Sequence, residues 1–168
     1  NRDPKHRDGR MVLAQIYAEN KRSDLARQIL MDGLAYHGAD PDYVATLLNF
    51  LLSQEDDQAV LTLSDQILQR RPDKKMIQTA AIAAATACYY RGNYDRAESY
   101  LAKWHQQDGR DGSLLTSRIA WERGYHPLAL LLLRNLSVEF PGDEAVYAQL
   151  TEYLEADHLT DEARRRAV

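Results

Sequence analysis

Apolar residues recur along this chain at every third or fourth position, the spacing of an amphipathic helix, and the strict alternation of a strand is scarce. Ala, Leu, Arg, Gln and Glu, which favour helices, are abundant. The prolines and most of the glycines fall between the periodic runs or near their ends. The pattern predicts an all-α chain with ten helices, over residues 9–20, 23–37, 41–54, 56–70, 73–91, 94–107, 111–123, 126–139, 143–157 and 160–168.

A small residue follows a short polar turn at five places, and these places are regularly spaced. The five residues are Ala26, Ala59, Ala97, Ala129 and Ala163, which recur about every 34 residues. A leucine stands one helical turn after each of the first four, at Leu30, Leu63, Leu101 and Leu133. This regularity predicts five copies of one helix–turn–helix unit, the last incomplete, which stack because one unit cannot bury its apolar face alone.

The residue types suit such a unit. A small residue lets two antiparallel helices approach closely, and the leucine one turn later fills the gap between them. Gly92 and Gly124 suit helix ends that need a positive φ. The interval from Ala59 to Ala97 is the longest, which predicts a longer loop or a longer helix around Asp73–Met76.

A period of about 34 residues with these residue types resembles the tetratricopeptide repeat. The third unit carries the resemblance best, through Ala85, Tyr89, Gly92, Tyr94, Ala97 and Leu101. The resemblance covers essentially the whole chain and implies a single domain over residues 1–168, a right-handed α-solenoid of antiparallel helix pairs. It also implies binding of a protein or peptide on the concave face lined by the first helices, without naming the partner.

The concave face is expected to be apolar and aromatic in its middle. The candidate partner-binding residues are Val44, Leu48, Leu51, Ile82, Thr86, Tyr89, Tyr90, Leu114, Arg118 and Trp121. We expect this groove to take an amphipathic helix or an extended apolar segment, because contiguous exposed apolar surface marks interaction sites and aromatic residues anchor them. The alternative is that Leu51, Leu52 and Trp121 are partly buried between neighbouring first helices. The Lys, Asn and Arg clamp with which one subclass binds acidic C-termini is not found at the matching positions.

Charge and composition narrow the classes of partner. The net charge is −4 and the sequence pI about 5.7, which disfavours nucleic acid because its partners usually carry a basic stripe. The longest apolar run, Leu128–Leu133, is too short to span a membrane. The single cysteine, Cys88, is expected to be a buried thiol, and leaves open a cytoplasmic or a bacterial periplasmic location. The chain begins at Asn1 and ends within an apparent helix start, so we expect a piece of a longer protein.

Sequence signals for catalysis or cofactor binding are not found. There is no dinucleotide or P-loop fingerprint, and "DGRDG" at 108–112 lacks the ligand pattern of a calcium loop. The five histidines are spread along the chain, and no two of them are four residues apart as a helical metal pair would be. We therefore expect a non-catalytic interaction scaffold without cofactor or metal. The alternative is a docking or polysaccharide-handling module of a larger bacterial export or enzyme assembly, and self-association through the solenoid ends is a further expectation.

Overall fold

The computed structural model describes residues 6–70, 73–103 and 109–166, with side chains described as far as His158. These residues form nine α-helices and no strand, so the all-α prediction is confirmed. The helices are α1 (Arg7–Glu19), α2 (Ser23–His37), α3 (Pro41–Ser53), α4 (Asp57–Gln69), α5 (Lys74–Tyr90), α6 (Tyr94–Lys103), α7 (Arg110–Glu122), α8 (His126–Glu139) and α9 (Glu144–Arg166). The end of the helix expected over 94–107 lies outside the described residues.

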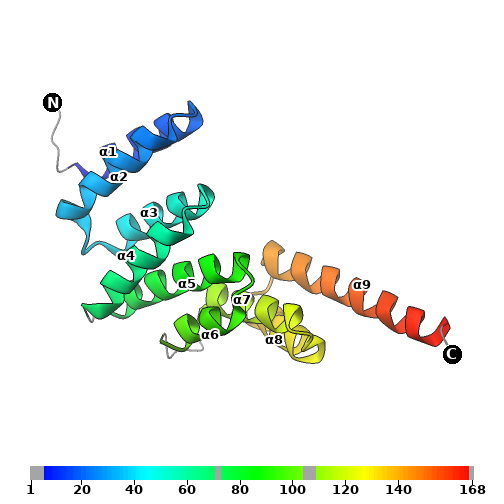
Figure 1. The fold of residues 1–168 in the computed structure, drawn as a ribbon. Coiled ribbons are helices and arrows are strands. Elements are labelled where there is room, and N and C mark those ends of the chain that lie inside the picture. Colours follow the sequence, from blue (N-terminus) through cyan, green and yellow to red (C-terminus); the bar gives the residue numbers. More distant parts are fainter. Residues whose placement is uncertain (1–5, 71–72, 104–108, 167–168) are drawn as a thin grey trace. The chain divides into compact units, whose positions relative to one another are not determined.

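The chain divides into two compact units, α1–α6 and α7–α9, and each is described by itself. In the first unit consecutive helices pack against one another, and α3 also contacts α1 and α5. The first helix of each pair therefore contacts the first helix of the next pair as well as its own partner. In the second unit α8 packs on both α7 and α9 (Figure 1).

The turns that end α1, α3, α5 and α7 share one backbone geometry. Each contains a residue with φ between 56° and 80°, namely Lys21, Glu55, Gly92 and Gly124. The N–H of the following residue donates to a carbonyl on the last turn of the helix, as from Asn93 to Cys88 at 2.9 Å and from Arg22 to Tyr17 at 2.8 Å. This is the Schellman motif, which satisfies the last carbonyls of a helix. The turns recur about every 34 residues, so four helix hairpins repeat in the described chain.

The second hairpin lies one residue out of the register expected from the alanines. At the fifth position after the positive-φ residue, each second helix has a side chain with 0% exposure, at Ala26, Val60, Ala97 and Ala129. The residue chosen from the sequence, Ala59, is half-buried. The prediction is wrong here because Val60 occupies the site of close helix approach, and the buried Ser64 takes the place of the leucine one turn later.

Helix α5 accounts for the longest interval between turns. It has 17 residues, whereas α1, α3 and α7 have 13 residues each. Of the two expected explanations, the longer helix is confirmed. The side chain of Asp73 caps its N-terminus by accepting from the backbone N–H of Met76 at 2.9 Å. The helix is rich in small buried residues, at Ala80, Ala81, Ala83, Ala84, Ala85 and Ala87.

Helix α9 is continuous over 23 residues, so the break expected between 157 and 160 is wrong. His158 lies one repeat period after Gly124, where the other hairpins turn, and it is helical. The segment 144–166 contains neither glycine nor proline to favour a turn. The first half of α9 nevertheless packs like a first helix, because Val146 and Tyr153 belong to the core that α7 and α8 form. The fifth copy thus contributes a first helix without a turn after it.

Candidate functional site

The α3 residues expected on the concave face lie in the core. Val44, Leu48 and Leu51 are all 0% exposed and present no surface to a partner. The reason is the same one-residue register error, because one residue corresponds to about 100° of rotation around a helix. Counted from the positive-φ residues, the α3 positions that correspond to Met11, Gln15, Ala18 and Glu19 of α1 are Ala45, Asn49, Leu52 and Ser53.

These corrected positions are all exposed or half-buried. On α1 and α3 the five positions alternate between exposed and half-buried, and on α5 the first four are half-buried and the last is exposed. We call this set the first-helix face of the first unit: Asp8, Met11, Gln15, Ala18 and Glu19, then Asp42, Ala45, Asn49, Leu52 and Ser53, then Thr79, Ile82, Thr86, Tyr89 and Tyr90. Of the α3 members, Ala45, Asn49 and Ser53 were missed, although Leu47, Leu48 and Leu51 already mark one side of α3 as apolar.

On α5 the expected residues lie together on this face. Ile82, Thr86 and Tyr89 are half-buried, and the Thr86 hydroxyl donates to the Ile82 carbonyl at 2.8 Å. The Tyr89 ring lies edge-on to Tyr90 at 5.5 Å and 6.0 Å from Tyr94. Tyr90 itself is 71% exposed, so its ring presents most of its surface to solvent.

A groove of about 440 Å³ lies between α1 and α3. Its walls are mostly aliphatic or aromatic, with polar groups at the rim. The lining residues are Asp8, Met11, Val12, Ala14, Gln15 and Ala18 of α1, Leu30 of α2, and Thr46 and Phe50 of α3. Since several members of the first-helix face of α1 line it, the groove continues that face towards α3.

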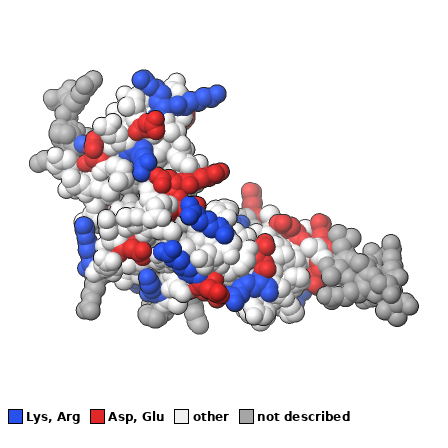
Figure 2. All heavy atoms as spheres, in the orientation of Figure 1, with Lys and Arg blue, Asp and Glu red and all other residues white. Residues whose placement is uncertain are grey.

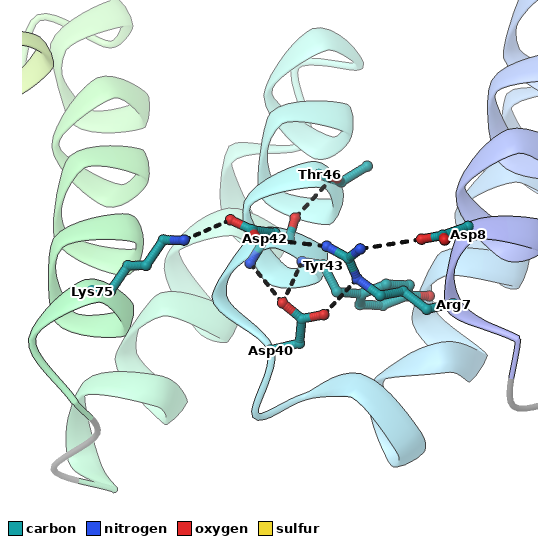
Figure 3. Close-up of polar contacts among 7 residues, drawn as sticks. All are labelled: Arg7, Asp8, Asp40, Asp42, Tyr43, Thr46 and Lys75. Atoms are coloured by element: carbon teal, nitrogen blue, oxygen red, sulfur yellow. Dashed lines mark hydrogen bonds and ion pairs between the residues drawn. The ribbon is translucent and has the colours of Figure 1, made fainter.

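Ion pairs join the N-terminal ends of the first helices. Arg7 Nε lies 2.5 Å from Asp40 Oδ2, and Lys75 Nζ lies 2.9 Å from Asp42 Oδ1 (Figure 3). Each pair connects the start of one first helix with the start of the next. The hydrogen bond from Lys75 holds the pKa of Asp42 below its ordinary value. Asp40 also caps α3 by accepting from the backbone N–H of Asp42 at 3.0 Å. These charged side chains are therefore paired with one another, and each pair connects two neighbouring first helices.

In the second unit, Leu114 and Trp121 pack within the protein. Leu114 is buried in the core. The Trp121 ring stacks between His126, at 4.1 Å between centroids, and Tyr153, at 4.0 Å. Arg118 Nε donates to Gln149 Oε1 at 2.8 Å. Trp121 is therefore packed against neighbouring helices, as in the alternative noted from the sequence.

Helices α7 and α9 are also joined at their N-terminal ends. The Arg110 guanidinium donates through Nη2 to Asp143 Oδ1 at 2.8 Å and through Nε to the other carboxylate oxygen. These hydrogen bonds lower the pKa of Asp143 to about 2 and raise the pKa of Arg110. Asp143 also accepts from the backbone N–H groups of Ala145 and Val146 at the start of α9. The pair repeats, in the second unit, the link between consecutive first helices that the first unit has.

The one cysteine and the possible metal ligands among the described residues can be checked directly. Cys88 is buried, as expected, and burial raises the pKa of its thiol, which opposes the reactive thiolate. No three His, Cys, Asp or Glu side chains in the described ranges come together as metal ligands would. Nor does any helix in the described part of the chain have the length and apolar character needed to cross a bilayer. On the face in Figure 2, basic and acidic side chains are interspersed among large uncharged areas.

Neither a protein-family model nor a curated protein sequence matches the chain. The helix hairpins and their surfaces are therefore the features that indicate the class of protein.

Proposed function

We propose that the chain is a tetratricopeptide-like scaffold, a right-handed solenoid that binds a peptide or helical segment of another protein without catalysis. The observation that carries the proposal is the recurrence of one Schellman turn about every 34 residues. Stacked helix hairpins with this period are typical of repeat proteins, which use extended surfaces for binding.

The partner would lie on the first-helix face of the first unit. Tyr90 supplies an exposed aromatic ring at one end of that face, and the apolar groove between α1 and α3 lies at the other. Ile82 and Leu52 provide half-buried apolar surface on the helices between them, and Asn49 is exposed for hydrogen bonding. This arrangement suits a segment with apolar side chains on one side, since an aromatic anchor and an apolar groove contribute most of the binding energy at such sites.

Selection of peptides from a displayed library tests the proposal. We expect the chain to enrich sequences with regularly spaced apolar residues, and fluorescence anisotropy to show that Tyr90→Ala and Asn49→Arg each weaken binding of those peptides about tenfold or more. Ser99→Ala is the matched control, because Ser99 is exposed on the second helix of the same hairpin as Tyr90.

Two results would contradict the proposal. Peptides whose affinity does not change in the Tyr90 and Asn49 variants would place binding elsewhere on the chain. Binding to a glycan array in the absence of any selected peptide would favour the polysaccharide-handling alternative, in which Tyr90 stacks on a sugar ring.

A further inference from the structure

The outward face of α8 is apolar where the other second helices are mostly polar. Leu128, Leu131 and Val138 are 48%, 53% and 82% exposed. The stripe consists of Leu128, Leu131, Asn135 and Val138. Counted from the positive-φ residue of each turn, the equivalents of the last three are Gln28, Asp32 and Ala35 on α2, and Thr62, Gln66 and Gln69 on α4, and all six are exposed. On α6 the residues equivalent to Leu128, Leu131 and Asn135 are Arg96, Ser99 and Lys103. The residues equivalent to Leu128 are Leu25 on α2 and Ala59 on α4, and both are half-buried. The repeat itself therefore does not require large exposed apolar residues along this stripe.

The spacing along this stripe is that of a coiled coil. Leu128, Leu131, Asn135 and Val138 follow one another in steps of three, four and three, which is the spacing of the a and d positions in two consecutive heptads. All four are exposed. A polar Asn at an a position is the residue with which coiled coils specify register and oligomeric state, at some cost in stability.

Charges on the two sides of the stripe complement each other. Arg134 precedes the second a position and is a g residue, and Glu139 follows the last d position and is an e residue. Both are exposed, and neither forms an ion pair with another described residue. In a parallel pair of helices a g residue faces the e residue five positions later on the other helix, and that is the separation of Arg134 and Glu139.

We propose that α8 pairs with α8 of a second copy of this chain as a short parallel coiled coil. In such a pair a two-fold axis runs parallel to the two helices. It places Arg134 of each copy against Glu139 of the other, giving two interchain ion pairs. It also brings Asn135 against Asn135 of the second copy, where the two amides hydrogen-bond. An antiparallel pair would instead place the two Arg134 side chains on the same side of the interface, where they repel.

The geometry also indicates how strong the association is. α8 has 14 residues and is therefore about 21 Å long, so the stripe covers about two heptads. A pair of such helices buries less than the roughly 1,200–2,000 Å² of a standard interface, so we expect a dissociation constant in the micromolar range or weaker. Because α8 is already folded against α7 and α9, association does not have to order the helix, unlike in an isolated peptide.

Sedimentation velocity over a concentration series tests the dimer. The wild-type chain is expected to shift from monomer to dimer as concentration rises, and Leu131→Glu to remain monomeric. Thr62→Glu is the matched control, because Thr62 occupies the same position on α4 and is exposed there. Circular dichroism of each variant is the control for retention of the fold. A wild-type chain that stays monomeric up to about 1 mM, or a Leu131→Glu variant that dimerises like wild type, overturns the proposal.

Two further variants test the parallel orientation. Arg134→Glu and Glu139→Arg are each expected to weaken the dimer about fivefold or more, and the double reversal to restore most of that loss. Asn135→Cys is expected to form an interchain disulfide under mild oxidation, whereas Gln66→Cys, at the equivalent exposed position of α4, is not. A dimer in which the charge reversals show no coupling and Asn135→Cys does not crosslink would contradict the parallel arrangement.

Discussion

Trp121 of α7 and Tyr153 of α9 lie face to face, with ring centroids 4.0 Å apart and planes 11° apart. His126 covers the opposite face of the indole at 4.1 Å. Trp121→Ala removes both ring contacts and leaves a cavity against the core of the second unit. We expect the free energy of unfolding to fall by about 2–4 kcal/mol, measured by urea denaturation followed by circular dichroism.

Tyr90→Ala provides the contrast, because that ring is mostly exposed. We expect its unfolding free energy to stay within about 0.5 kcal/mol of wild type. Equal stability of the two variants would mean that the aromatic stack around Trp121 contributes nothing, and Trp121 would again be a candidate anchor for a partner.

Gly33 allows α2 and α3 to approach closely. A Cβ atom there would clash with the Tyr43 hydroxyl and would lie 2.6 Å from its Cζ. That hydroxyl donates to the Leu30 carbonyl at 2.8 Å inside the core. We therefore expect Gly33→Ala to lower the unfolding free energy by about 1–3 kcal/mol, although alanine is the better helix former.

The Gly33→Ala loss has a specific check. In a Tyr43→Phe background the nearest clashing atom, the Tyr43 hydroxyl oxygen, is absent. Gly33→Ala should therefore lower the unfolding free energy by less in that background than in the wild type. Equal costs in both backgrounds would show that the crowding by the Tyr43 hydroxyl is not the cause.

The four turns offer a paired experiment. Gly92 has φ of 70°, and no atom lies within 4 Å of where an added Cβ would be, so Gly92→Ala introduces backbone strain without a clash. We expect a loss of about 1 kcal/mol in unfolding free energy. Glu55 has φ of 56° in the equivalent turn, and Glu55→Gly is expected to be neutral or stabilising by up to about 1 kcal/mol. Loss of stability in both variants would argue against the shared turn geometry.

Acid should weaken the link between α7 and α9. Hydrogen bonds from Arg110 lower the pKa of Asp143 to about 2. Because the pKa is lower in the folded state, the contribution of this carboxylate is present above the ordinary pKa of aspartate and is lost as pH falls from about 4 towards 2. Unfolding measured at several pH values should show a smaller decline for Asp143→Asn, whose amide oxygen can still cap α9. Parallel pH profiles for both proteins would contradict this role.

The helices could be predicted because their signals are local. Apolar spacing, Pro41 at the start of α3 and the glycines of two turns locate most boundaries within a few residues. The register of the second hairpin could not be predicted in the same way. Its turn has Glu55 at the positive-φ position and Val60 at the helix crossing, where the other copies have Gly or Lys and Ala. Ala59 lies one residue before Val60 and matches the alanine of the other copies, so it was chosen in place of Val60.

The choice of Ala59 in place of Val60 caused most of the wrong assignments in the candidate site. With α3 rotated by one position, the core residues Val44 and Leu48 were predicted in place of Ala45 and Asn49. The positions on α5 remained on the first-helix face, because Gly92 fixed the register there. Trp121 could not be assigned from spacing alone, since its burial depends on Tyr153, a residue of the following helix pair.

The alanine-rich side of α5 has a consequence for how the chain can diverge. Six buried alanines bring neighbouring helices close with little side-chain volume between them. Any larger residue at these positions would push the helices apart, whereas the exposed faces of α2, α4 and α6 can exchange polar residues freely. Among homologues, α5 should therefore be the slowest-changing helix of the first unit, and its sequence the most useful for detecting distant members of the lineage.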